Sequence, residues 1–141
     1  MTKMSTAQDR PRSGEVLHGG ALLWPGSDGY RPGATTPEEL TAAAHAACFT
    51  MTLAHTLARN GHSVRKITAN ARATFGIAEH VRVIRRSRLD ITVQADGLGE
   101  PELTQAAELA GRYCPVSNTL RIGGVELHVA AHLAAPVPAS G

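Results

Sequence analysis

The sequence contains few aromatic residues and little charge. Aromatic residues make up 4% of its 141 residues and charged residues 18%, and the formal net charge is +2 with histidine neutral. Few aromatic rings leave few platforms for stacking bases, and a nearly neutral chain lacks the basic surface that binds phosphates. No apolar run approaches the ~20 residues of a membrane-spanning helix, and residues 1–14 lack the apolar stretch of a secretory signal. We therefore expect a cytoplasmic protein that binds neither nucleic acid nor membranes.

Cysteine is also scarce, since the chain has only Cys48 and Cys114. A permanent disulfide is uncommon in a reducing cytoplasm, which leaves packing, metal ligation or catalysis for these thiols. Free cysteine is among the most buried residue types, so simple packing is as open as the chemical interpretations at this point. The sequence around each cysteine is therefore needed to distinguish packing from metal ligation and catalysis.

What the chain has in quantity is apolar side chains, at 43% of its residues. A chain of this length and composition predicts one globular domain with a core of its own. We place this domain at residues 15–134. Residues 1–14 form a polar segment that can pair as an edge strand, and residues 135–141 form a flexible tail.

One long helix is expected over residues 36–61. Thr36 is a suitable N-cap, and Pro37 follows at the first helical position, where its missing N–H does no harm. Glu39 stands three residues after Thr36, which completes a capping box. Gly61 follows the last turn and can adopt the left-handed conformation that ends many helices.

The centre of this helix carries no charge. Between Thr41 and Thr56 there is no Lys, Arg, Asp or Glu, and alanines occupy every side of the first half. A surface helix would show one charged face, so this helix is predicted to be central and largely buried, with a second subunit covering what one small sheet cannot. Cys48 lies in its middle. His45, one turn earlier, shares the face of Cys48, and a satisfied core position is the simplest role for it.

The rest of the chain alternates between patterns typical of strands, turns and helices. The predicted elements are a hairpin at 15–24, a Gly/Pro-rich loop at 25–34, strands at 64–75, 82–95 and 125–133, a turn at 76–80, and helices at 100–113 and 115–120. This order predicts an α+β domain with an antiparallel sheet and helices on one side. The arginines of the second strand are expected to form a solvated face of that sheet.

Cys114 comes directly before Pro115, which breaks one helix and can open the next. The cysteine is then placed at a helix N-terminus, where backbone N–H groups and the positive end of the helix dipole stabilise negative charge. Arg31 lies in the loop before the long helix, and loops on a rigid scaffold often carry function. In isolation, a solvated loop arginine is the simpler role for Arg31, whereas the position of Cys114 favours a chemical role for that thiol over simple packing.

Two separate motifs now resemble those of the OsmC/Ohr family. They are TPEEL at residues 36–40 followed by AAHAACF at 43–49, and CPVS at 114–117 followed by Leu120. The sequence around both cysteines is more similar to the OsmC branch than to the Ohr branch. The predicted long helix, the spacing of the motifs and the flanking strands match the pattern of the family over residues 15–133. The resemblance implies antiparallel sheets packed around a long buried central helix in an intertwined homodimer. It also implies a thiol-dependent peroxidase for organic hydroperoxides and hydrogen peroxide.

The same resemblance implies roles for individual residues. Cys48 matches the peroxidatic cysteine and Cys114 the resolving cysteine. Glu38 matches the family's acidic residue, and Arg31 is the candidate for its loop arginine, with Arg12 as the alternative. Glu38 precedes Cys48 by ten residues, about 15 Å along a helix, so it would hold the arginine rather than touch the sulfur. The resemblance implies an external dithiol as reductant, of the lipoyl type in some members, and no cofactor or metal.

Two other interpretations remain open at this point. His45 and Cys48 at helical spacing, with Cys114 as a third ligand, could form a metal-binding module. Alternatively, the chain could be a non-catalytic binding or structural relative whose cysteines only pack. Loss of both thiols on addition of a hydroperoxide would favour the peroxidase over either alternative.

Overall fold

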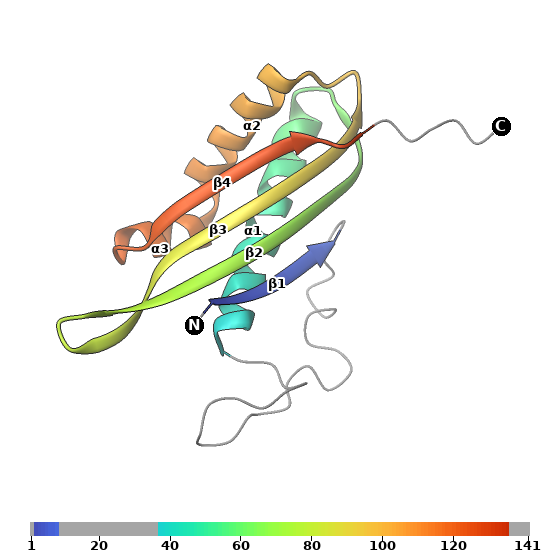
Figure 1. Ribbon diagram of the computed structural model, residues 1–141. Helices are drawn as coiled ribbons and strands as arrows, with labels where there is room; N and C mark the ends of the chain where they lie inside the picture. Colours follow the sequence, from blue (N-terminus) through green and yellow to red (C-terminus); the bar gives the residue numbers. More distant parts are fainter. Residues whose placement is uncertain (1, 9–36, 136–141) are drawn as a thin grey trace.

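The computed structural model describes residues 2–8 and 37–135 (Figure 1). The elements are β1 (Thr2–Gln8), α1 (Pro37–Arg59), β2 (Ser63–Ala78), β3 (Val81–Asp96), α2 (Glu100–Tyr113), α3 (Pro115–Ile122) and β4 (Glu126–Leu133). The predicted hairpin at 15–24, the loop at 25–34 and the N-cap Thr36 lie outside the described residues. Within the described ranges, no helix combines the length and hydropathy that crossing a membrane would require.

The four strands form one mixed sheet in the order β1-β2-β3-β4, with α1 and α2 against one face (Figure 1). The N-terminal segment thus contributes the edge strand β1. The pairs β1–β2 and β2–β3 are antiparallel, but β4 runs parallel to β3. The prediction of an antiparallel sheet is therefore wrong for the last strand. A parallel neighbour needs a crossover of a dozen or more residues, which α2 and α3 together provide.

The β2–β3 hairpin is longer than predicted. Both strands continue past the expected turn at 76–80, so that only Glu79 and His80 connect Ala78 to Val81. Both connecting residues have positive φ, 50° and 68° respectively. Two-residue loops of this kind match the right-handed twist of the strands, although they usually contain Asn or Gly. The chain has neither residue at these two positions, so the sequence predicts a longer turn that begins at Gly76.

The core lies between α1 and the sheet. The predicted alternation in β2 is confirmed from Ile67 to Ala73, since Ile67, Ala69, Ala71 and Ala73 are all buried. It does not extend to Phe75, which follows a register shift after Thr74 and is only half-buried. The largest buried side chains that meet the buried residues of β2 are Phe49, Leu53 and Leu57 of α1, Leu89, Ile91 and Val93 of β3, and Leu103 of α2. The small side chains of β2 allow α1 to lie close to the sheet, which fixes the depth of the residues in the middle of α1.

The other side of α1 is not covered by the described part of the chain. Ala44, His55 and Ala58 are exposed there, and Met51 is 60% exposed. These residues follow the spacing of one helix face. The prediction that α1 is largely buried therefore holds on the side facing the sheet and not on this one, and its cover by a second subunit stays a prediction.

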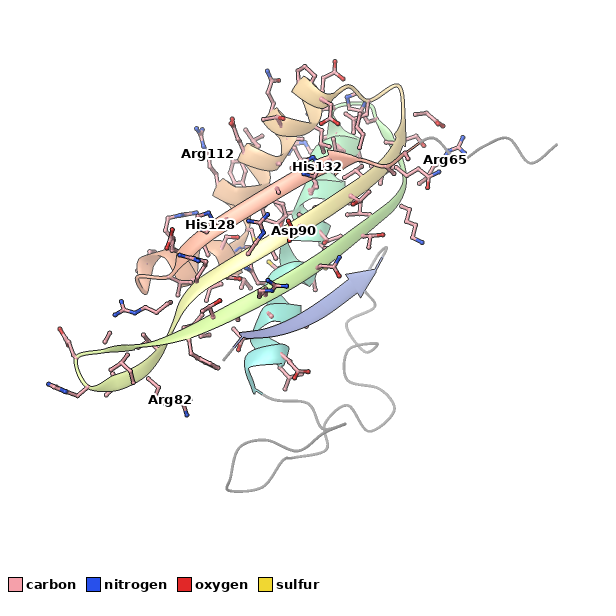
Figure 2. All side chains as sticks on the ribbon, viewed as in Figure 1. Arg65, Arg82, Asp90, Arg112, His128 and His132 are labelled. Carbon is pink, nitrogen blue, oxygen red and sulfur yellow. The ribbon has the colours of Figure 1, made fainter. Side chains whose placement is uncertain are left out.

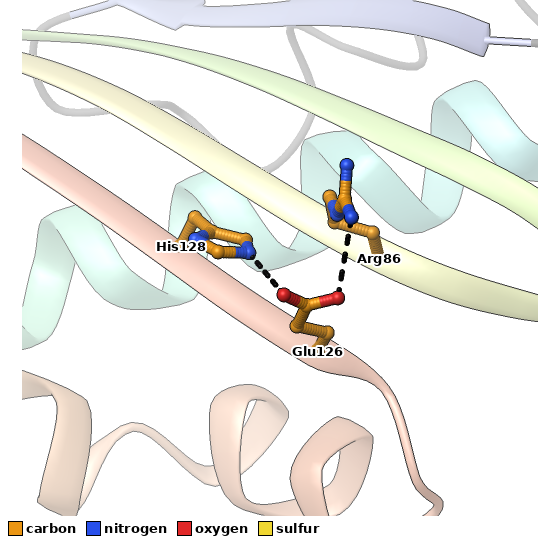
Figure 3. A network of polar contacts seen from close by, with 3 residues as sticks. All are labelled: Arg86, Glu126 and His128. Carbon is orange, nitrogen blue, oxygen red and sulfur yellow. Dashed lines mark hydrogen bonds and ion pairs between the residues drawn. The ribbon is translucent and has the colours of Figure 1, made fainter.

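The sheet face away from the helices is polar, as expected for the arginines of β3. Figure 2 shows Asp90 and His128 on this face, and Asp90 pairs with Arg88 at 3.1 Å. Glu126 accepts hydrogen bonds from His128 at 2.7 Å and from Arg86 at 3.3 Å (Figure 3). The His128 hydrogen bond, followed by the contact with Arg86, lowers the pKa of Glu126. All of these groups are exposed, so the network links β3 to β4 at the surface without forming a buried site.

Candidate active site

The two cysteines lie where α1 meets the junction of α2 and α3. Cys48 is in the middle of α1 and half-buried, whereas Cys114 is fully buried between the two shorter helices. Cys114 ends α2, because its N–H donates to the Ala110 carbonyl at 2.8 Å, and it is also the N-cap of α3. Pro115 follows at the first position of α3. The predicted location of Cys114 at a helix N-terminus is confirmed.

The first turn of α3 supplies a backbone donor to each sulfur. The Ser117 N–H donates to the Cys114 sulfur at 3.4 Å, and the Val116 N–H donates to the Cys48 sulfur. Both cysteines carry free thiols, and they lie close enough together that the Cys114 thiol raises the pKa of Cys48. The two sulfurs are thus brought together from positions 66 residues apart in the sequence under the start of one helix, where N–H groups favour negative charge.

The described surroundings do not by themselves activate Cys48. Burial raises the pKa of its thiol above the ordinary value, and the Cys114 thiol raises it further. The Val116 N–H and the Thr52 hydroxyl lower this pKa, but they do not outweigh burial. No cation among the described residues contributes to the balance. Because the thiolate is the reactive form, a peroxidase built on Cys48 would need positive charge from elsewhere.

The described residues include only one of the other predicted site residues, Glu38. Arg31 and Arg12 lie outside the described residues. Glu38 is the second residue of α1, ten residues before Cys48, which places its backbone about 15 Å away along the helix. Their roles stay predictions.

His45 has buried hydrogen-bond partners that the sequence did not reveal. It is completely buried, and both ring nitrogens are used: Nδ1 lies 2.7 Å from the Ser87 hydroxyl of β3, and Nε2 lies 2.8 Å from the Ser117 hydroxyl of α3. The interpretation of His45 as a metal ligand with Cys48 and Cys114 is therefore wrong. These three residues do not form a group that could hold a metal ion. The expectation of a satisfied core histidine is confirmed.

Burial lowers the pKa of His45 from the ordinary 6.5 to about 4. The folded pKa lies below the unfolded one, so the unfolded chain takes up the proton first as the pH falls. We expect stability to be unaffected by this group above pH 6.5 and to fall between pH 6.5 and pH 4. The full loss is about 3 kcal/mol, on the order of 1.4 kcal/mol for each pH unit in that window.

Urea unfolding at a series of pH values would check this prediction. The exposed His55 offers a matched control, because His55→Gln should keep the wild-type pH dependence and His45→Gln should flatten it. Equal pH dependence in the wild type and in His45→Gln would contradict the assignment.

An open groove of about 810 Å³ runs between α1 and α2, and on α1 it begins at Met51, on the C-terminal side of Cys48. Its lining includes Met51, Thr52, His55, Arg59, Leu109 and Tyr113. Thr52 lies one turn beyond Cys48 and donates a hydrogen bond to the Cys48 carbonyl at 2.9 Å. The groove thus leads along the exposed side of α1 away from the thiol pair, with Met51 and Leu109 as its most apolar exposed side chains.

Comparison with known proteins identifies the family. The model of the OsmC-like protein family matches residues 27–130, well over half of the chain, and the chain belongs to this family. Among curated proteins, Peroxiredoxin OsmC of Escherichia coli (strain K12) is 32% identical over 87 residues. That match covers 62% of this chain and 61% of the relative, less than two thirds of its length. The family predicted from the two cysteine motifs is confirmed.

Solved structures show the same fold. An OsmC-like protein from Mycoplasma pneumoniae matches 74% of this chain and 79% of its own, with a TM-score of 0.66 and 18% identity. An organic hydroperoxide resistance protein from Legionella pneumophila matches 74% of this chain and 73% of its own, with a TM-score of 0.59 and 25% identity. The α+β architecture around a long helix is therefore the architecture of this family.

Proposed function

We propose that this protein is a thiol-dependent peroxidase that reduces organic hydroperoxides and hydrogen peroxide with Cys48 and Cys114. The observation that carries the proposal is the pair of free, neighbouring thiols, one from each family motif, under the first turn of α3. The names of its relatives support it, because one is a peroxiredoxin and another an organic hydroperoxide resistance protein.

Cys48 is the attacking thiol, since it is only half-buried while Cys114 is fully buried. Its thiolate attacks one peroxide oxygen, so that an S–O bond forms and the O–O bond breaks. The released alkoxide takes up a proton and leaves as an alcohol, or as water from hydrogen peroxide. Cys114 then attacks the resulting sulfenic acid: an S–S bond forms, the S–O bond breaks, and hydroxide leaves as water. An external dithiol, of the lipoyl type in our proposal, restores both thiols by exchange.

The positive charge that Cys48 lacks comes from Arg31 in this proposal, held by Glu38 at the start of α1, with Arg12 as the alternative. An arginine next to a thiol stabilises the thiolate and can donate hydrogen bonds to the departing oxygen. The proposal needs such a residue because burial raises the pKa of Cys48 and no cation among the described residues lowers it.

Arg31→Ala is therefore expected to slow the oxidation of Cys48 by at least about tenfold near neutral pH, because the thiolate fraction falls. Stopped-flow measurement of sulfenic acid formation would show this, with Arg12→Ala as the matched control at the wild-type rate. The reverse result, a slow Arg12→Ala and a normal Arg31→Ala, would transfer the role to Arg12.

A homodimer completes the proposal. The exposed face of α1, with Ala44, Met51 and His55, is small and uncharged enough for a second copy to approach closely. Tyr113, 69% exposed beside the same groove, extends this surface onto α2. Apolar cover near Cys48 would suit an apolar hydroperoxide and exclude water from the reacting sulfur.

The direct test is to add one equivalent of cumene hydroperoxide to reduced protein and to count free thiols and released alcohol. The proposal predicts the loss of both thiols and one alcohol for each protein chain. Unchanged thiols with intact hydroperoxide would contradict the peroxidase and favour a non-catalytic member of the family.

A further inference from the structure

Helices α1 and α3 meet at two points that lie one helical turn apart. The first is the thiol pair Cys48 and Cys114, and the second is the hydrogen bond between His45 and Ser117. On α1 the histidine precedes the cysteine by three residues, and on α3 the serine follows the cysteine by three. Residues three apart share a helix face, so the two contacts run side by side between the same two helices.

The second contact is also connected to the resolving thiol. The Ser117 hydroxyl lies 2.8 Å from His45 Nε2, while the Ser117 N–H donates to the Cys114 sulfur at 3.4 Å. On its other side, His45 Nδ1 lies 2.7 Å from the hydroxyl of Ser87. His45 and both serines are at most 2% exposed. A neutral imidazole has one donor and one acceptor, so one serine donates to it and the other accepts from it.

This chain of hydrogen bonds is the buried polar attachment of α3 to α1, whereas Asn118 and Arg121 attach α3 to the backbone of α2 at the surface. Ser117 is the only residue of α3 that is buried, and the whole of α3 lies within the described residues. Ile122, at the far end, is 86% exposed. Val116 packs against the core but is only partly buried, so the buried hydrogen bond of Ser117 fixes where the first turn of α3 sits. A buried serine without a partner would cost more than its bond contributes.

We propose that His45 is a positioning residue that acts through Ser117 to hold the resolving thiol of Cys114 against Cys48. It controls how fast the Cys48–Cys114 disulfide forms, and it leaves the attack of Cys48 on peroxide unaffected. This inference rests on the proposed peroxidase function for its role in turnover, but the placement of the thiols can be measured without peroxide.

The consequence lies in the fate of the Cys48 sulfenic acid. When Cys114 attacks it, the S–S bond forms and water leaves. When Cys114 is displaced, the sulfenic acid instead attacks a second hydroperoxide, which oxidises the sulfur to sulfinic acid and is itself reduced to an alcohol. A loosened α3 therefore shifts the product from disulfide to sulfinic acid without changing the first step.

Two substitutions of His45 separate positioning from packing. Glutamine places its amide near the Nε2 position and can still reach Ser117, whereas asparagine places its amide near the Nδ1 position and reaches Ser87 instead. We expect His45→Asn to form the disulfide about tenfold more slowly and to accumulate sulfinic acid, while His45→Gln stays close to the wild-type rate. Both variants should form sulfenic acid at the wild-type rate in the first turnover.

The two serines give a matched pair of controls, since they are equally buried and at similar distances from His45. Ser117→Ala should slow disulfide formation as His45→Asn does, and Ser87→Ala should not, although both remove one buried hydrogen bond. Thermal unfolding of each variant shows whether its fold is retained at the assay temperature.

The peroxide-free readout is the equilibrium of the thiol pair with oxidised and reduced dithiothreitol, which measures how favourably Cys114 is placed beside Cys48. His45→Asn and Ser117→Ala should make the disulfide about tenfold less favourable, and His45→Gln and Ser87→Ala should not. Equal values for Asn and Gln, or for the two serine variants, would overturn the positioning role. A different outcome would separate the two proposals: the thiols do not react with peroxide, but the variants still differ in this equilibrium as predicted. That outcome would refute the peroxidase function and support the positioning of Cys114 by His45.

Discussion

Cys48→Ser is expected to abolish hydroperoxide consumption while the protein stays folded. A serine hydroxyl is a far weaker nucleophile than a thiolate, and removal of a reacting nucleophile typically costs at least ~10³ in rate. Cys48 is half-buried on α1 and outside the group of fully buried side chains that form the core, so the exchange of sulfur for oxygen should change stability little. Peroxide loss at one equivalent per chain, followed spectroscopically, measures the effect.

The matched control for this variant is Cys48→Ala, which removes the polar atom altogether. Both variants should be inactive, and both should keep the wild-type far-UV circular dichroism spectrum and a thermal midpoint close to it. Residual peroxide consumption at the wild-type rate in either variant would show that Cys114 or another group attacks the peroxide.

The second large effect is expected for Cys114→Ser. Serine is among the preferred N-cap residues, so α3 should still begin at Pro115 and the fold should be retained. The variant should consume the first equivalent of peroxide at the wild-type rate and then lose turnover, because its Cys48 sulfenic acid has no partner thiol. Further peroxide should convert Cys48 to sulfinic acid, which thiols do not reduce.

Mass spectrometry of the variant after excess peroxide would detect this product as the gain of two oxygens on the peptide that contains Cys48. The wild type under the same conditions provides the comparison, with its two cysteines joined instead. Steady cycling of Cys114→Ser with a dithiol, and no sulfinic acid, would show that Cys114 is not the resolving cysteine.

Most of the fold could be predicted because the ends of its elements are marked in the sequence. Pro37, Gly61, Pro101 and Pro115 stand at or within two residues of observed helix ends, and the alternating residues of β2 and β3 point to the core as predicted. The parallel direction of β4 was missed because a single strand's pattern is the same in either direction. The helices before it were the available signal, since a strand–helix–strand order favours parallel pairing.

The candidate site was predictable in part for a similar reason. Cys48 and Cys114 lie in contiguous motifs, so short-range sequence identified them. The partners of His45 are 42 and 72 residues away, and no spacing along the chain encodes such contacts. One signal did exist: Ser87 occupies the inward phase of β3 together with Leu89 and Ile91. A polar residue at a core position predicts a buried hydrogen bond, and the partner of such a residue is worth seeking.

The electrostatics of Cys48 could not be predicted from its motif. The helix start of α3 favours negative charge, yet burial outweighs the Val116 N–H and raises the pKa of the Cys48 thiol. This balance depends on how deeply α1 lies against its neighbours, which emerges only from the packed structure. It also makes the proposed arginine a requirement of the peroxidase proposal rather than an addition to it.

The central claim is that Cys48 and Cys114 work as one redox pair. Peptide mapping of the wild-type protein after one equivalent of cumene hydroperoxide tests it most directly. We expect the Cys48 and Cys114 peptides to be recovered joined, with the loss of two hydrogens, and a dithiol to separate them again. Recovery of both cysteines as free thiols, or of sulfinic acid at Cys48 beside a free Cys114, would contradict it.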